Sequence, residues 1–247
     1  MSKYEYGGYN RGEGINSKGT NMYQQQVNRV LEKVKLLNLT LAPVIELSKL
    51  QKIEEELNIQ LPDSYKIFLT QVQNGESSNT LDTKGPYYGI YSIEEALTQN
   101  REWGIELEKD FQFEQDLELG DLYNAEEDLE KHIYRLENDA EYQSAAQVVI
   151  DKYNDTSVLN GSLFICEYGC GDFLRLVVTG KSAGQIWVDS GVINGTGFYS
   201  LNVDILTFYE NWLNRKIEIL SDPSKKHINA YYSFLEFGDN KRYQVVP

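Results

Sequence analysis

Three apolar stretches separated by glycine turns, in the last third of the chain, constrain the fold more than any other feature. The stretches cover residues 163–166, 173–178 and 185–188. The turns between them, at 168–172 and 180–184, are rich in glycine, which adopts the positive φ angles that tight hairpin turns need. The pattern predicts a strand, a hairpin turn, a returning strand and then a third strand.

Helices are expected on both sides of this β region. Apolar residues recur at helical spacing in four segments, at about residues 22–38, 44–57, 63–73 and 204–216. Pro62 opens the third of these helices, and Asn74 with Gly75 ends it, in keeping with the usual preferences at helix ends. A short strand is predicted over 87–91, followed by a helix that Ser92 caps.

The charge of the chain is unusual and is concentrated in one region. Of its 247 residues, 38 are acidic and 23 are basic, which gives a formal net charge of −15 and a sequence pI of about 4.6. Residues 101–141 hold 15 acids and 4 bases, so −11 of that charge lies there. Sequence-independent nucleic-acid binding and attraction to anionic membranes both need basic residues, so the composition argues against both. A basic protein partner fits the charge.

Within this region, residues 105–119 alternate between apolar and acidic side chains. The acids at even positions are Glu106, Glu108, Asp110, Glu114, Asp116 and Glu118. A period of two predicts a strand with one apolar and one acidic face, although Glu and Asp disfavour strands and Trp103 to Glu114 also fits part of a helix. Two explanations of the acidic face stay open: a contact surface for a partner, or a solvated surface that adds solubility.

The remaining parts of the chain are interpreted from their composition. Residues 1–21 combine glycine with tyrosine and hold almost no aliphatic side chains, so we expect a flexible arm. Residues 22–220 are expected to form a single domain with an acidic insertion at about 97–160, helical over 125–152. The tail at 221–247 carries aromatic residues and is expected to pack on the domain.

Three further absences bear on location. Two cysteines are too few for a disulfide framework, and no N-terminal basic segment precedes an apolar run. No stretch reaches the roughly 18 apolar residues of a membrane helix. We therefore expect a cytoplasmic protein.

Enzymatic motifs are weak throughout the sequence. Gly180-Lys181-Ser182 resembles the end of a phosphate-binding loop, but Arg175 stands where that motif needs glycine, and a strand follows where it needs a helix. The two cysteines, spaced C-x₃-C, and the two isolated histidines lack the local spacing of zinc ligands. We expect no catalytic residue, no metal site and no cofactor.

Four motifs, in the correct order, resemble those of the SUKH superfamily, which includes a fungal cell-wall-synthesis regulator and many bacterial immunity proteins. They are a helix–Leu-Pro–helix entry at 53–69 ending at Asn74-Gly75, a strand leading into a helix at 89–95, a glycine-aspartate hairpin at 164–173 followed by Gly180, Gly184 and a strand at 186–188, and a closing helix at 208–213.

The resemblance implies an α+β domain, with helices packed against a mainly antiparallel sheet, and no enzyme activity. Asp172 would either cap its turn or contact a partner. The residues to which the resemblance gives structural roles are Leu61, Pro62, Asn74, Gly75, Gly169, Gly171, Trp187 and Trp212.

The resemblance also implies a function. In bacteria, it implies a protein that binds and neutralises a cognate polymorphic toxin, often a nuclease, whose phosphate-holding surface would be basic. The acids of residues 106–118 are then the candidate contacts, because an acidic surface steers association with a basic one. The alternative is a regulatory or scaffold protein that binds other proteins, as in the fungal branch.

Overall fold

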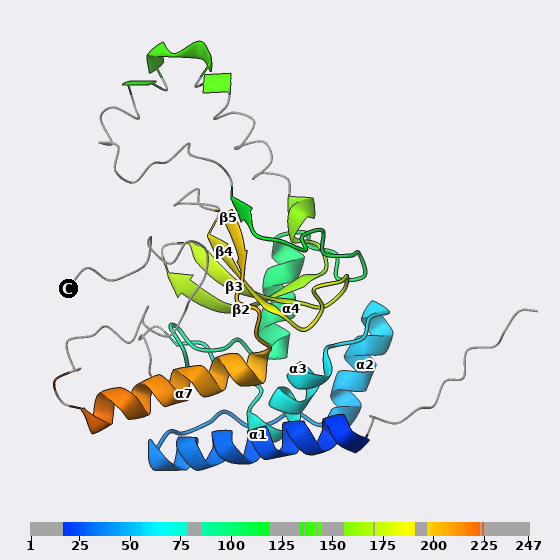
Figure 1. The fold of residues 1–247 in the computed structure, drawn as a ribbon. Helices are drawn as coiled ribbons and strands as arrows, with labels where there is room; N and C mark the ends of the chain where they lie inside the picture. The colour runs from blue at the N-terminus through cyan, green and yellow to red at the C-terminus, as the bar shows by residue number, and fades with distance from the viewer. Residues whose placement is uncertain are drawn as a thin grey trace, which may run out of the picture.

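A five-stranded antiparallel sheet forms the centre of the molecule, with strands in the order β1–β5–β4–β3–β2 (Figure 1). The computed structural model describes residues 17–78, 85–118, 134–135, 137–141, 143–144, 156–169, 171–190, 197–222 and 224. The strands are β1 (Leu117–Glu118), β2 (Ser162–Gly169), β3 (Asp172–Val177), β4 (Ile186–Ser190) and β5 (Gly197–Ser200). The predicted α+β class is therefore confirmed.

The predicted hairpin and the strand after it are also confirmed. β2 and β3 pair antiparallel out to Gly169 opposite Asp172. Gly169 and Gly171 have φ angles of +123° and +85°, which glycine adopts without the steric cost that a Cβ would bring. β5 is missing from the sequence prediction; it pairs with β4 and extends the sheet toward β1.

The helices cover the sheet and each other. They are α1 (Ser17–Leu36), α2 (Leu47–Leu57), α3 (Asp63–Ile67), α4 (Ile93–Glu102) and α7 (Ile205–Ser221), with a π-helical turn, η1 (Phe68–Val72), and a 3₁₀ turn, η3 (Thr156–Leu159). α4 packs against β2, while α1 lies beside α7 on the side of the molecule that α3 also joins (Figure 1). The four predicted helices are present, the third divided between α3 and η1.

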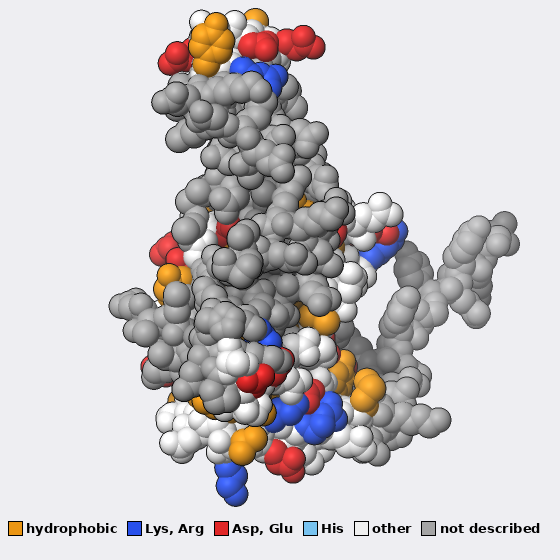
Figure 2. Space-filling view, turned by 60° about the vertical axis from the view of Figure 1, so that its left-hand side comes forward, with side chains coloured by type: hydrophobic (Ala, Val, Ile, Leu, Met, Phe, Trp, Pro, Cys, Tyr) orange, Lys and Arg blue, Asp and Glu red, His pale blue; other side chains and the backbone are white. Residues whose placement is uncertain are grey.

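A charged cluster joins α1 to α7. Glu210 accepts hydrogen bonds from Arg29 Nε (2.9 Å) and Lys33 Nζ (2.6 Å), and a further one from the Gln26 amide (3.3 Å). Burial alone would raise the pKa of Glu210, but the hydrogen bonds and charges of Arg29 and Lys33 outweigh it and lower the pKa to about 2. Figure 2 shows Lys and Arg side chains interspersed with Asp and Glu over the lower part of the molecule, where α1 and α7 lie.

The predicted strand over 87–91 is wrong. A turn in which the Gly89 amide donates to the Pro86 carbonyl (2.9 Å) interrupts it, and both Tyr87 and Gly89 have positive φ angles. Only Ile90 forms a bridge to the edge of the sheet, opposite Cys166 of β2. The helix that follows is confirmed: Ser92 Oγ accepts a hydrogen bond from the Glu95 amide at the start of α4.

The helix-entry motif residues lie in the interior or at element boundaries. Leu61 is buried, and Pro62 precedes the first residue of α3. Asn74 Oδ1 accepts from the Ile93 amide (3.1 Å), which ties η1 to the start of α4. Gly75 lies so close to the Ile90 and Tyr91 carbonyl oxygens that a Cβ would overlap them. Trp187 and Trp212 are both buried in the core.

Several predictions lie outside the described residues. They concern residues 1–16 of the arm, most of the helical prediction over 125–152, and nearly all of the tail after residue 222. Where the structure does describe helices, none is both long enough and apolar enough to cross a membrane.

Candidate functional site

The acidic segment, which we define as residues 105–116, is fixed to the sheet through its backbone. At its start, the Gly161 amide donates a hydrogen bond to the Glu106 carbonyl (3.0 Å). The Glu106 amide in turn donates to Asn160 Oδ1 (2.8 Å). Both partners belong to the turn that leads into β2, so the polar backbone of the segment is satisfied on its inner side.

The same arrangement continues along the segment. The Phe111 amide donates to the Thr179 carbonyl (3.2 Å), and the Thr179 hydroxyl lies 2.5 Å from the Lys109 carbonyl oxygen. Ser182 Oγ donates to the Phe113 carbonyl (3.0 Å). These partners lie in the turn between β3 and β4, so two turns of the sheet hold the segment along its length.

Two glycines make this close approach possible. At Gly161 (φ +73°), a Cβ would overlap the Phe111 amide nitrogen and the Lys109 carbonyl oxygen. At Gly180 (φ +95°), a Cβ would lie 2.9 Å from the Phe111 carbonyl oxygen. The sequence predicts a turn at Gly180 but none at Gly161, and it gives no sign that these two positions receive the acidic segment.

The apolar side chains of the segment point into the core. Those that are buried are Ile105, Leu107 and Phe111. The Phe111 ring packs edge-on against Trp187, with centroids 5.1 Å apart, and Phe113 stacks on Phe198 at 5.4 Å. The predicted inside–outside alternation is therefore confirmed. The predicted strand is confined to β1, because the backbone of the segment pairs with turns rather than with a neighbouring strand.

The acids of the segment point outward. The exposed ones are Glu106, Glu108, Asp110, Glu114 and Asp116. Glu106 forms an ion pair with Lys109, and Glu114 forms one with Lys181 at 2.6 Å. All four of these side chains are about half exposed or more, and exposed pairs of this kind contribute little to stability.

The remaining acids differ in their surroundings. Asp116 Oδ1 accepts a hydrogen bond from the Ser200 amide (2.8 Å) of β5, so it helps to hold the edge of the sheet. Glu108 and Asp110 make no side-chain hydrogen bond or ion pair to any described residue. Glu118 lies in β1, and its side chain is outside the described part of the structure. Glu108 and Asp110 are thus the acids with most freedom to meet a partner.

Asp172 does not belong to this exposed set. Its side chain is 2% exposed, and its Oδ2 accepts a hydrogen bond from Ser190 Oγ of β4 (2.9 Å). The prediction that Asp172 contacts a partner therefore does not fit the structure, because burial inside the sheet keeps its carboxylate from the surface. Asp172 is not a candidate contact.

A buried ion pair lies near Asp172 in the sheet. Arg175 of β3 is 0% exposed, and its Nη1 lies 3.6 Å from Asp189 Oδ2 of β4. Arg175 Nε donates to Ser162 Oγ (2.9 Å), and the guanidinium lies over the Phe164 ring at 3.9 Å. These contacts stay within the sheet, so the charges serve the fold.

Cys166 is poorly suited to nucleophilic chemistry. Cys166 is buried in β2, and burial raises the pKa of its thiol well above the ordinary value. A thiol with a raised pKa has little of the reactive thiolate form. Cys170, His132 and His227 lie outside the described residues. Among the residues that the structure does describe, no three His, Cys, Asp or Glu side chains gather as a metal site would require.

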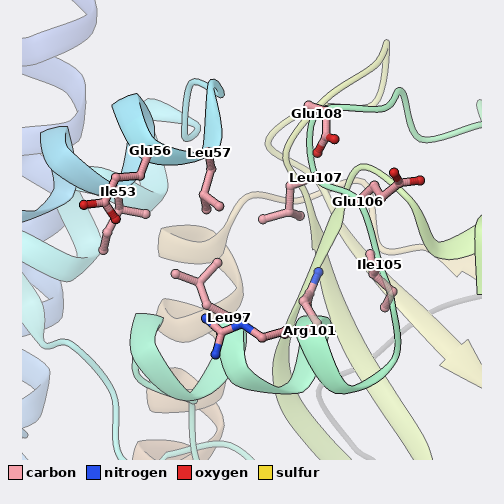
Figure 3. A pocket seen from close by; sticks show the side chains of 10 residues that line it. Ile53, Glu56, Leu57, Leu97, Arg101, Ile105, Glu106, Leu107 and Glu108 are labelled. Atoms are coloured by element: carbon pink, nitrogen blue, oxygen red, sulfur yellow. The ribbon is translucent and has the colours of Figure 1, made fainter.

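A groove of about 270 Å³ opens where the acidic segment faces α2 and α4. Leu57 of α2, Leu97 of α4 and Leu107 of the segment converge on it from three sides (Figure 3). Glu56 and Glu108 lie at its rim. The groove could not be predicted from the sequence, because its walls come from three segments far apart in the chain.

Comparison with known proteins gave one match. A sequence model of the SMI1/KNR4 family (SUKH-1) matches residues 45–201, which is more than half of the chain. The matched region contains the sheet, α2 to α4 and the acidic segment. Searches of the curated proteins and of the solved structures found no match.

Proposed function

The chain belongs to the SMI1/KNR4 family (SUKH-1), and from this premise we propose that it is a non-enzymatic immunity protein. In this proposal it binds a cognate bacterial toxin and blocks it by direct contact. The immunity role is the one that the sequence resemblance implies for bacterial members, and the structure supplies a surface suited to it.

The outward acids of the acidic segment are the observation that carries the proposal. The backbone of the segment is fixed by the turns at Gly161 and Thr179, while Glu108 and Asp110 stay exposed. A surface that is ordered before binding loses little conformational freedom on association, which favours affinity. Acids held in this way attract a basic partner and raise its association rate.

A nuclease toxin suits this surface well. Such an enzyme holds the phosphates of its substrate with basic side chains, and a row of carboxylates can occupy the same groups. Binding of this kind needs no chemistry from the immunity protein.

Co-expression tests the proposal. The gene next to the one for this chain is examined for a long protein with a toxin-like C-terminal domain, and that domain is produced in bacteria with or without this chain. We expect growth only when the chain is present, and a complex of the two proteins in gel filtration. Growth arrest that the chain does not relieve, together with the absence of a complex, would contradict the proposal.

Charge variants then test the surface. Replacing Glu106, Glu108, Asp110 and Glu114 with their amides should weaken the complex by at least about tenfold and flatten its salt dependence. The control removes acids elsewhere, at Glu32 and Glu55 of α1 and α2, both of which are exposed. If both sets of variants behave alike, or if neither changes affinity, the acidic segment is only a solvated surface.

The second candidate is a regulatory or scaffold protein. Its support is the tyrosine–glycine sequence of residues 1–21 and the aromatic sequence of residues 221–247, both of which are suited to binding proteins. A chain without residues 1–16, the part of the arm that precedes α1, separates the two roles. An immunity protein that acts through the acidic segment keeps its protection of the cell after this deletion, whereas a scaffold that acts through the arm loses its partner.

A further inference from the structure

The groove between α2, α4 and the acidic segment has an apolar floor and an acidic rim. The floor is formed by Ile53 and Leu57 of α2, Leu97 of α4, and Ile105 and Leu107 of the segment. Leu57 remains 36% exposed, so the groove presents apolar surface to solvent. Its volume of about 270 Å³ lies below the roughly 300–1,000 Å³ of small-molecule sites, which makes it a pocket for one large side chain.

The charges around the groove select the kind of partner. The acids that line it are Glu56, Glu106 and Glu108, and the base is Arg101. In Figure 3 the carboxylates of Glu56 and Glu106 are turned away from Leu57, Leu97 and Leu107, and Glu106 forms an ion pair with Lys109. Glu108 has no ion pair to a described residue, and Asp110, two residues beyond it, is also exposed. Glu108 and Asp110 therefore leave negative charge on the acidic-segment side of the groove, while Arg101 places a positive charge on the α4 side.

We infer that this groove receives one large apolar side chain, such as Phe or Leu, from a basic segment of the partner protein. Lysine or arginine residues next to that apolar residue would lie against Glu108 and Asp110. The inference rests on the proposed binding function and adds an anchor to it, because charge complementarity raises the association rate more than it raises affinity. A buried apolar side chain in a pocket is the usual centre of such an interface.

A model peptide tests the groove without the toxin. The probe is acetyl-Lys-Lys-Phe-Lys-Lys-amide, followed by methyl and amide NMR of the labelled full chain. We expect saturable shifts at Leu57, Leu97 and Leu107, with a dissociation constant on the order of 1 mM. The matched peptide with Ala in place of Phe should bind at least about fivefold more weakly, since it lacks the apolar group that the pocket buries.

Two variants of α2 provide the matched comparison. Leu57→Lys places a charge at the groove and should weaken the Phe peptide at least about fivefold. Leu47→Lys makes the same change at the first residue of the same helix, where the side chain is 54% exposed and outside the groove. It should leave affinity within about twofold. Both sites are exposed enough that the variants should fold, which the amide spectrum itself checks.

Several outcomes would overturn the inference. They are equal binding of the Phe and Ala peptides, equal binding of a Glu-Glu-Phe-Glu-Glu peptide, and no saturable shift at about 10 mM peptide. If the shifts at these leucines instead depend on the concentration of the protein, the groove is a contact between copies of this chain, and the inference is wrong. The groove and the proposed function can fail separately. If the Leu57→Lys variant still protects cells fully in co-expression, the groove is not the anchor, but the immunity role is not contradicted.

Discussion

The interior of the sheet and the acidic segment both carry charged side chains, but they use them in opposite ways. In the sheet, Arg175 of β3 and Asp189 of β4 form an ion pair, and both are buried. In the acidic segment, most hydrogen bonds to the sheet and its turns come from the backbone, and Asp116 adds one from its side chain, while Glu108 and Asp110 are exposed to solvent.

The difference separates charges that serve the fold from charges that do not. A buried charge without its partner is costly, so the sheet depends on both members of its pair. An exposed carboxylate contributes little to stability, so replacing it can change binding to a partner without changing the fold. Substitutions in the two regions can therefore break this contrast or sharpen it.

The largest effect is expected inside the sheet. Arg175→Met removes one member of the pair and leaves Asp189 buried with less compensation, so we expect a loss of about 3–5 kcal/mol in the free energy of unfolding. Urea denaturation, followed by tryptophan fluorescence, to which the buried Trp187 and Trp212 contribute, measures it.

The double variant Arg175→Met with Asp189→Asn is the control for that prediction. It removes both charges together, so it should lose less stability than Arg175→Met alone. If the two substitutions instead add their full separate costs, the pair does not act as a unit and the contrast with the acidic segment weakens.

The next effect tests how the acidic segment is held. Gly161→Ala places a methyl group against the Phe111 amide and the Lys109 carbonyl, so the segment must move, and we expect a loss of about 2–4 kcal/mol. Gly104→Ala is the matched control, because Gly104 also has a positive φ (+67°) but nothing lies within 4 Å of its added Cβ. It should lose only about 1–2 kcal/mol. Equal losses at the two glycines would mean that backbone strain alone acts, and that the turn does not hold the segment.

Glu210 is an intermediate case, a carboxylate near the surface that is paired between α1 and α7. Its pKa is lowered to about 2, so the ionised form stabilises the folded chain above pH 4.5, and this contribution disappears as the pH falls toward 2. Glu210→Gln should cost about 2 kcal/mol at pH 7. It should also remove part of the loss of stability between pH 4.5 and 2, measured by urea unfolding at a series of pH values. An unchanged pH profile would show that Arg29 and Lys33 do not stabilise the carboxylate.

Most of the fold could be predicted from the sequence because its signals are local. Helical spacing located α1, α2 and α7, and the glycine turn between β2 and β3 fixed their pairing. β5 was missed because it follows directly on a glycine-rich stretch that has no strand signal of its own.

The candidate site could be predicted only in part. The alternation of residues 105–116 correctly indicated which side chains are buried, since burial follows polarity. It could not indicate that Gly161 and Thr179 bind the backbone of the segment, or that Leu57, Leu97 and Leu107 line one groove, because these residues lie far apart in the chain. The prediction that Asp172 contacts a partner was wrong, because a hydrogen bond from Ser190 allows its carboxylate to be buried.

The smallest effect on stability is expected at the exposed acids. Glu108→Gln with Asp110→Asn should change the free energy of unfolding by less than about 0.5 kcal/mol, because neither carboxylate has a hydrogen bond or ion pair to a described residue. Glu114→Gln, which also loses the pair with Lys181, should stay within about 1 kcal/mol. Urea unfolding at low and high salt measures both variants. A loss above about 1 kcal/mol for the Glu108 and Asp110 variant would mean that these carboxylates serve the fold, as those of the sheet do. A small change, combined with a weaker complex, would show that the acidic segment keeps its charge for a partner.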